Sequence, residues 1–325
     1  MNVKELIRTI NHTLKSHNLF PENSRILVAC SGGPDSMALL YLLQDIATHR
    51  HTTYKIGVAI VDHCIRPESK DEVLWLKHQV EELGLPFYST TFDVPRLSKE
   101  YKKSEETIGR QVRYQWLTEI ARSEGYDYIS VAHHKDDQAE SILAHIIRGS
   151  GLNGLTGMSV VHSEYAIPVV RPLLDVTKEN LLAYIGTKQI SYCVDSTNDD
   201  VRYQRNRIRH RIIPELEAVN PAVVDAIVRL GSSVNEDVMV ISDLTARTFD
   251  KLVSIGKDEV RISRRALRQE PLAIQRRLWQ RLVSTIDPDL TLTSAHQEQL
   301  LDIVNTGEKK TFTIKSIKVI AQCDT

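Results

Sequence analysis

The sequence of 325 residues has few cysteines and no long hydrophobic run. Its four cysteines, Cys30, Cys64, Cys193 and Cys323, lie far apart and form no CxxC pair. This spacing argues against a disulfide scaffold, a zinc ribbon and a dithiol redox centre. No apolar run approaches the roughly 20 residues that cross a bilayer, and the first residues lack an apolar signal segment. We therefore expect a cytoplasmic protein that does not associate with a membrane.

An excess of charge of one sign is also missing. The chain has 41 lysines and arginines against 42 aspartates and glutamates, and its net charge is −1. The total charge therefore does not require a polyanionic partner. However, residues 202–211 contain five arginines in ten positions. Since salt confines the field of such a patch to about 8–10 Å, it can bind phosphates although the whole chain is nearly neutral.

Strand-like and helix-like segments alternate from residue 25 to about 147. Strands are expected at 25–30, 55–62, 87–92 and 128–132, and helices at 37–47, 68–83, 105–123 and 136–147. This alternation predicts an α/β fold, a doubly wound parallel sheet with helices on both faces. Ligands of such sheets bind at the carboxyl ends of the strands.

The pattern changes beyond residue 150. A glycine-rich loop, an extended stretch at 165–174 and a helix at 178–187 precede the chain-breaking Pro214 and Pro221. The remaining chain is mostly helical in pattern, with short strands near 258–262 and 311–320. We predict a catalytic domain at 1–216 and a smaller, mainly helical domain at 217–325 that contacts RNA.

A glycine-rich loop follows the first expected strand and precedes a helix. It consists of Ser31, Gly32, Gly33, Pro34, Asp35 and Ser36. The glycines let backbone N–H groups approach a phosphate, and the helix directs its positive end at that anion. Asp35 is a candidate magnesium ligand. The loop is not a Walker A sequence and has no lysine. A plain surface turn is the alternative, but SGGxDS resembles the signature of N-type ATP pyrophosphatases, which cleave ATP between the α- and β-phosphates.

Acidic residues cluster after the fourth expected strand. Asp136, Asp137 and Glu140 share one face of the helix that begins there, because they lie three and four residues apart. Such a cluster can hold magnesium or the ammonium group of a cationic substrate, although acidic residues also simply cap helices. His133 and His134 lack the partners of a zinc site.

Arginines form the third candidate group. Arg110 and Arg113 share a helix face and could neutralise polyphosphate charge, or form ordinary surface ion pairs with Glu106. Arg205, Arg207 and Arg209 alternate along the basic segment and do not all share one helix stripe. This favours contact with phosphates or partial burial at a site over a solvated helix face.

Taken in order, these segments resemble the tRNA(Ile)-lysidine synthetases. The shared motifs are SGGxDS at 31–36, VDHxxR at 61–66, a Glu-to-Tyr motif at 106–114, AHHxDDQxE at 132–140, RGSGxxGLxGM at 148–158, RPLL at 171–174, and a D-x-[ST]-N segment leading to RNRIR at 195–209. The resemblance covers about residues 24–216. Gly109 departs from the alanine usual in the family, a change that costs roughly 1 kcal/mol inside a helix.

The resemblance implies a two-step reaction on the wobble cytidine 34 of tRNA(Ile) with a CAU anticodon. ATP would adenylate the C2 oxygen, and the ε-amine of L-lysine would then displace AMP, changing codon specificity from AUG to AUA. It also allows a homodimer. Implied roles are ATP binding by residues 31–36, Mg²⁺ binding by Asp35 and Asp136, phosphate neutralisation by Arg110 and Arg113, lysine binding by Asp137 and Glu140, and tRNA binding by Arg148, Arg171, Asn198, Arg205, Asn206, Arg207 and Arg209.

Three other functions remain open on the sequence. A small-molecule amidotransferase or synthetase would often bring a glutaminase domain, and it would leave the arginine-rich segment unexplained. A 2-thiocytidine synthetase would share the glycine-rich loop, but it needs cysteine pairs that this chain lacks. A non-catalytic ATP-sensing or tRNA-binding module would not need Asp35, Asp137 and Glu140 all intact.

Overall fold

The computed structural model describes residues 2–50, 52–163, 165–194, 204–257, 259–288, 290–306 and 309–322. The chain divides into two compact units, unit 1 from Met1 to Ser232 and unit 2 from Ser233 to Thr325. The predicted assignment of a catalytic role to residues 1–216 and an RNA-contacting role to 217–325 stays a prediction. Among the described residues, no helix is both long and apolar enough to span a membrane.

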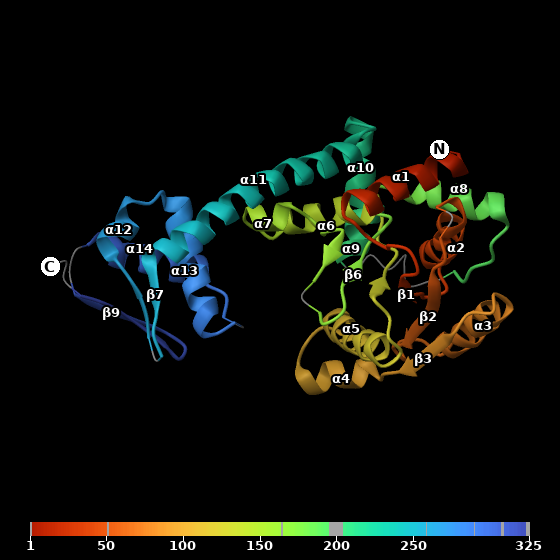
Figure 1. Ribbon diagram of the computed structural model, residues 1–325, viewed down its shortest axis with the longest axis horizontal. Coiled ribbons are helices and arrows are strands. Elements are labelled where there is room, and N and C mark those ends of the chain that lie inside the picture. The colour runs from red at the N-terminus through yellow and green to blue at the C-terminus, as the bar shows by residue number, and fades with distance from the viewer. Residues whose placement is uncertain are drawn as a thin grey trace. The chain divides into compact units, whose positions relative to one another are not determined.

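Unit 1 is built on a six-stranded sheet in the order β3-β2-β1-β4-β6-β5 (Figure 1). Its strands are β1 (Arg25–Ala29), β2 (Lys55–Asp62), β3 (Phe87–Thr91), β4 (Tyr128–Ser130), β5 (Val161–His162) and β6 (Val169–Val170). All neighbours are parallel except β5 and β6. The predicted doubly wound sheet is confirmed. Because β1 lies between β2 and β4, the strand order reverses there, and their carboxyl ends flank the crevice where such sheets bind ligands.

The helices of unit 1 cover both faces of this sheet. They are α1 (Val3–Ser16), α2 (Pro34–His49), α3 (Ser69–Glu82), α4 (Val94–Tyr101), α5 (Glu105–Ser123), α6 (Lys135–Ile147), α7 (Leu152–Leu155), α8 (Lys178–Lys188), α9 (Gln204–Arg207), a π-helical segment (Ile208–Ile212), α10 (Ile213–Val219) and the start of α11 (Val223–Leu252). Helices α1 and α4 were not predicted from the sequence, and α7 lies within the glycine-rich segment that was predicted to be a loop.

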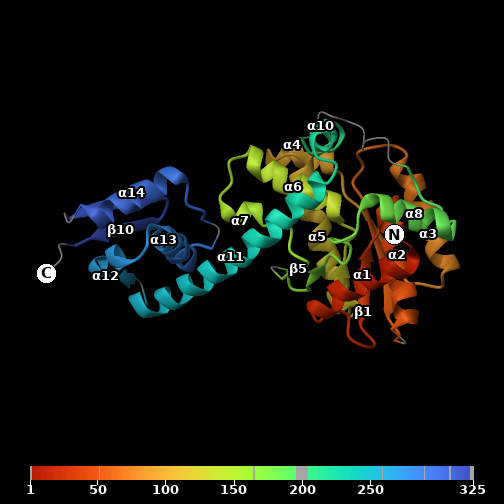
Figure 2. The ribbon, with the colours of Figure 1, turned by 90° about the horizontal axis from the view of Figure 1, so that it is seen from above.

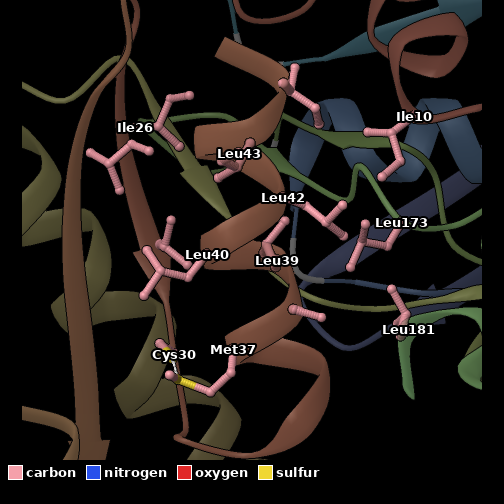
Figure 3. Packing of buried hydrophobic residues seen from close by; sticks show 14 of the residues in the cluster. Ile10, Ile26, Cys30, Met37, Leu39, Leu40, Leu42, Leu43, Leu173 and Leu181 are labelled. Atoms are coloured by element: carbon pink, nitrogen blue, oxygen red, sulfur yellow. Dashed lines mark hydrogen bonds between the residues drawn. The ribbon is translucent and has the colours of Figure 1, made fainter. Parts of the chain in front are cut away.

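Alternate residues of the central strands supply two separate cores. Ile26 and Val28 of β1 pack in the core that includes α1, α2, α3 and α8, whereas Leu27 packs with Tyr114 of α5 on the opposite face. Figure 3 shows α2 in the first core, with Ile26 and Cys30 on one side of the helix and Ile10, Leu173 and Leu181 on the other. Helix α2 is therefore buried on several sides, which fixes the loop at its N-terminus.

Unit 2 is mainly helical, as predicted (Figure 2). It also contains two small hairpins. Its elements after α11 are β7 (Val253–Ile255), β8 (Val260–Ile262), α12 (Arg264–Gln269), α13 (Leu272–Ile286), α14 (Ser294–Asn305), β9 (Lys310–Ile314) and β10 (Ile317–Ala321). Leu278 of α13 and Leu300 of α14 are fully buried in its core. Unit 2 thus has a hydrophobic core of its own.

Candidate active site

The glycine-rich loop connects β1 to α2 at the strand-order reversal. Gly32 has a φ of +80°, a conformation that disfavours any residue with a Cβ. The Ser36 hydroxyl donates to the Gly33 carbonyl at 2.9 Å and accepts from the Ser31 N–H at 3.2 Å. These bonds hold the loop closed on itself. No described side chain caps α2 at Gly33, so its N-terminal N–H groups are available to an anion.

A lysine that the sequence analysis did not identify lies against this loop. Both carboxylate oxygens of Asp35 accept from Lys178 Nζ, at 2.5 and 2.6 Å. Lys178 is the first residue of α8, and its backbone N–H donates to Asp136 Oδ2 at 2.8 Å. The predicted magnesium ligands Asp35 and Asp136 are thus both bonded to the same residue, one through its side chain and one through its backbone.

His134 lies among three carboxylates. Its ring nitrogens are 3.7 Å from Asp35, 3.3 Å from Asp136 and 3.4 Å from Asp137. Burial alone would lower the pKa of His134, but the bond to Asp136 and the neighbouring carboxylates outweigh it and raise the pKa. His134 in turn helps to lower the pKa of Asp136 against the opposing effect of burial. His134 is therefore an imidazole with a raised pKa at the centre of the acidic cluster.

The carboxylates of Asp137 and Glu140 are buried and paired with two arginines. The exposed fractions of Asp137 and Glu140 are 7% and 1%. Arg205 donates from Nε to Glu140 at 2.9 Å and from Nη2 to Asp137 at 2.9 Å. Arg209 donates from Nε to Glu140 at 2.6 Å and from Nη2 to Asp137 at 3.0 Å. Two carboxylates and two guanidinium groups form a neutral cluster, in which bidentate contacts fix the geometry.

Asp137 also has a structural role, as the capping alternative predicted. Its Oδ2 accepts from the His134 backbone N–H at 3.0 Å, at the start of α6. Burial raises the pKa of Asp137, but His134, Arg205 and His133 outweigh this and hold the pKa at about 2. Asp137 is therefore ionised at neutral pH, with one oxygen directed to the helix cap and the other to the arginines.

The basic segment is divided between two environments. Arg205 and Arg209 lie four residues apart, share one face and point into the carboxylate cluster. Arg207 and Arg211 are exposed. The prediction that the run does not form a single stripe is consistent with this division. Sequence alone could not pair the inward arginines with Asp137 and Glu140.

A second group of cations lies beside α5. The guanidinium groups of Arg110 and Arg113 lie 4.9 and 5.4 Å from the centre of the Tyr114 ring, which stacks on Tyr165. Arg171 is only 3% exposed and donates to the Ser159 carbonyl at 2.8 Å. Burial lowers the pKa of both Arg113 and Arg171. Arg171 is buried and Arg113 partly buried, and cations withdrawn from water in this way favour an anionic ligand.

His133 links the two groups of charges. Burial, together with Arg205, Arg171 and Arg113, lowers its pKa to about 3, despite the opposing charge of Asp137. His133 is therefore neutral near pH 7. Because the pKa of His133 responds to charges from both groups, the carboxylates and the cations share one region of unit 1.

The predicted site residues are not all in contact with one another. Direct contacts join Asp137 and Glu140 to Arg205 and Arg209, and His134 lies near Asp35, Asp136 and Asp137. Arg148 ends α6 with an exposed side chain, and Arg110 and Arg207 are exposed as well. Asn206 is partly buried, and in the sequence it lies between the two inward-facing arginines. Asn198 lies outside the described residues.

Gln138 attaches the glycine-rich segment 148–158 to α6. Its side-chain amide accepts from the Met158 N–H at 2.6 Å and donates to the Met158 carbonyl at 2.8 Å. Gly157 has a φ of +70°, and a Cβ there would lie 2.6 Å from Gln138 Oε1. The two predicted motifs are therefore joined by a contact that needs glycine at position 157.

Residues 3–216 match the PP-loop domain family, and the chain belongs to this family of ATP-binding domains. The curated proteins to which it is similar include three tRNA(Ile)-lysidine synthases. The protein of Thermosipho africanus is 37% identical over 246 residues, or 75% of this chain. That of Porphyromonas gingivalis is 35% identical over 226 residues, or 69% of this chain. That of Caldanaerobacter subterraneus is 30% identical over 303 residues, or 92% of this chain. The chain spans 56%, 48% and 64% of the length of those proteins, respectively.

A solved structure supports the fold. The U34-tRNA thiolase of Methanococcus maripaludis, solved with its [4Fe-4S] cluster, aligns with a TM-score of 0.59 at 20% identity. The alignment covers 72% of this chain and 78% of that chain. At this identity the similarity concerns the fold alone, and it agrees with the PP-loop assignment.

The donor chemistry at the loop fits a magnesium ion bound together with ATP. Among the described residues, no group of three or more His, Cys, Asp or Glu side chains is arranged to hold a metal by itself. Mg²⁺, however, usually binds one or two carboxylates together with substrate phosphates and water. Asp35 and Asp136, on either side of His134, supply that number of carboxylates.

Proposed function

We propose that the chain is a tRNA(Ile)-lysidine synthetase, which joins L-lysine to cytidine 34 of tRNA(Ile) with a CAU anticodon. The observation that carries the proposal is the buried pair Asp137 and Glu140, two carboxylates in one cluster with the acidic residues of the PP-loop region. A cationic nucleophile such as lysine needs such a pair. The likeness to the tRNA(Ile)-lysidine synthases over more than two thirds of this chain supports it.

The first proposed step is adenylation of the cytidine. The loop and the N-terminus of α2 would bind the ATP phosphates, with Mg²⁺ held by Asp35 and Asp136. The C2 oxygen of the cytidine attacks the α-phosphorus, and the bond from that phosphorus to the bridging oxygen breaks, releasing pyrophosphate. Mg²⁺ would neutralise negative charge on the phosphates. Arg113 is positioned among the buried cations that favour an anion.

The second proposed step uses the carboxylate pair. The ε-amine of lysine loses a proton, attacks C2 and displaces AMP, which leaves with the former C2 oxygen. In the structure, Arg205 and Arg209 already neutralise Asp137 and Glu140. We infer that phosphates of the RNA attract these arginines on binding, since they belong to the same segment as the exposed Arg207. Asp137 and Glu140 can then bind the ammonium group, and Asp137 can accept its proton.

A thiolation activity is the nearest alternative. It would need cysteines for sulfur transfer or for an iron–sulfur cluster, and the sequence has no CxxC pair. Cys30 is buried under the loop, and burial raises its pKa. A buried thiol with a raised pKa is a poor nucleophile. The residues therefore favour lysine over a sulfur donor.

Incubation with tRNA(Ile) carrying a CAU anticodon, labelled lysine and ATP tests the proposal. We expect labelled tRNA together with one AMP and one pyrophosphate for each lysine incorporated. A tRNA with uridine at position 34 is the control and should stay unlabelled. Asp137→Asn should abolish incorporation, because it removes the proton acceptor. Absence of both lysine incorporation and AMP release, with intact ATP binding, would disprove the proposal.

A further inference from the structure

The ion pair between Lys178 and Asp35 joins two elements that are distant in sequence. Lys178 begins α8, and Asp35 lies in the first turn of α2, 143 residues earlier. The ammonium nitrogen lies 2.5 and 2.6 Å from the two carboxylate oxygens. Its side chain is 34% exposed, and that of Asp35 is 29% exposed. The pair therefore lies at the edge of the phosphate-binding loop, where a solvent-borne ligand can reach it.

The position of Lys178 is unfavourable for its own helix. A helix N-terminus carries a partial positive charge, which repels a cation in the first turn. Thr177 already caps α8, and Asp136 already accepts the Lys178 N–H. The helix therefore needs no ammonium group at this position. A charge placed against the local preference of its helix indicates a role outside that helix.

The glycine-rich loop lacks a cation of its own. Residues 31–36 contain no lysine or arginine, whereas a Walker A loop has a lysine that reaches the terminal phosphates. Pyrophosphate leaving from this loop carries several negative charges. The arginines Arg205 and Arg209 are paired with Asp137 and Glu140. Among the residues that the structure describes, Lys178 is the cation that donates hydrogen bonds to the aspartate of the loop.

We propose that Lys178 binds the β- and γ-phosphates of ATP and thereby supplies from α8 the positive charge that a Walker lysine supplies from the loop. The inference rests on the proposed ATP chemistry of the same site. Before ATP binds, Asp35 holds the ammonium group near the loop. When ATP is bound, Asp35 would be free to hold Mg²⁺, and the ammonium group of Lys178 would leave Asp35 for the phosphate oxygens. Each negative group keeps a positive partner during this exchange.

The chain contains a matched control on the same two helices. Lys188, at the other end of α8, pairs with Asp45 of α2, with its Nζ 2.8 Å from Asp45 Oδ2. Lys178→Gln and Lys188→Gln each remove one ion pair between α2 and α8 and change the net charge equally. Only Lys178 lies at the loop. A difference in nucleotide binding between the two variants therefore reports a phosphate contact and not the packing of α8 on α2.

The test is the binding of three ligands to the whole chain by calorimetry. The ligands are α,β-methylene-ATP with Mg²⁺, inorganic pyrophosphate with Mg²⁺, and AMP. We expect Lys178→Gln to weaken the first two by at least about tenfold, the loss of one charge-assisted hydrogen bond. AMP, which lacks the β- and γ-phosphates, should bind within twofold of the wild type. Lys188→Gln should bind all three normally, and Lys178→Arg should restore much of the affinity.

Other outcomes would overturn the inference. Equal weakening of AMP and of the two polyphosphates, or equal effects of Lys178→Gln and Lys188→Gln, would assign Lys178 a structural role only. Unchanged polyphosphate binding in Lys178→Gln would exclude the phosphate contact. These measurements need neither tRNA nor lysine. Failure of the wild type to incorporate lysine would therefore disprove the proposed function while leaving the phosphate contact supported.

Discussion

At the scale of single residues, two adjacent histidines have pKa values shifted in opposite directions. Burial, together with Arg205, Arg171 and Arg113, lowers the pKa of His133 to about 3, although Asp137 opposes this. His134 faces the carboxylates of Asp35, Asp136 and Asp137, which raise its pKa. Because one residue precedes α6 and the next caps it, the two rings point to different partners. Two histidines that look alike in the sequence thus have pKa values shifted in opposite directions.

Glu140→Gln should destabilise unit 1. The Glu140 side chain is fully buried and binds both Arg205 and Arg209. Its replacement leaves two guanidinium groups with only Asp137, and removing one partner of a buried pair costs about 3 kcal/mol. Urea denaturation followed by circular dichroism measures the loss. Glu119→Gln, on the exposed face of α5, is the control and should change stability by less than about 0.5 kcal/mol. Equal midpoints for the two variants would contradict the buried pairing.

His63 should make the protein less stable in acid. Burial and the nearby charge of Arg113 lower its pKa to about 4, from about 6.5 when unfolded. Between these values the unfolded chain binds a proton that the folded chain does not bind. Stability therefore falls as pH drops from about 6.5 to about 4, by up to about 1.4 kcal/mol per pH unit.

The comparison of wild type with His63→Asn isolates this contribution. Denaturation midpoints are measured at half-unit steps of pH. We expect the variant to lose less stability than the wild type between pH 6.5 and 4.5, and the two curves to run parallel above pH 7. Curves that stay parallel over the whole range would show that His63 titrates normally in the folded protein.

At the scale of elements, local sequence patterns were sufficient to predict most strands of the sheet. The expected bounds of β2 and α5 agree with the structure, because apolar spacing within each segment determines both. Helix α1 was not identified, although Leu6, Ile10 and Leu14 recur at helical spacing and are buried. That signal was present in the sequence.

The pairings within the site could not be found in this way. Asp35 meets Lys178 across 143 positions, and Asp137 meets Arg205 across 68. The sequence shows the charge of each of these residues, and its patterns indicated that all of them except Lys178 belong to the site. Their pairing depends on where α8 and α9 return to the sheet, and no local pattern encodes that.

Gly157→Ala should disturb the link between α6 and the segment at 148–158. The residue has a positive φ, and a Cβ would lie 2.6 Å from Gln138 Oε1. We expect a loss of at least about 1 kcal/mol, from backbone strain together with the weakened bonds to Met158. Thermal denaturation checks it. Gly151 has a φ of −70° and nothing within 4 Å of its added Cβ, so Gly151→Ala should cost only a few tenths of a kcal/mol. A larger loss at Gly151 would refute this interpretation.

At the scale of the whole molecule, the proposed RNA binding cannot depend on total charge. The net charge is −1, so long-range attraction of a polyanion is weak, and local placement of cations must supply it. The basic segment contains arginines of two kinds. Arg205 and Arg209 are paired with carboxylates, whereas Arg207 and Arg211 are exposed. The exposed pair can contact phosphates without first breaking an ion pair within the buried cluster.

Replacing both Arg207 and Arg211 with glutamine should therefore weaken tRNA binding without lowering stability. Each lost phosphate contact in a single-stranded loop reduces the slope of log K against log salt by about 0.7, so the pair should reduce it by about 1.4. Filter binding between 50 and 300 mM KCl measures the slope. Arg8→Gln with Arg96→Gln is the control, because it makes the same change in net charge at exposed positions on α1 and α4. If the control reduces the slope as much, tRNA binding depends on overall charge and the basic segment has no special role.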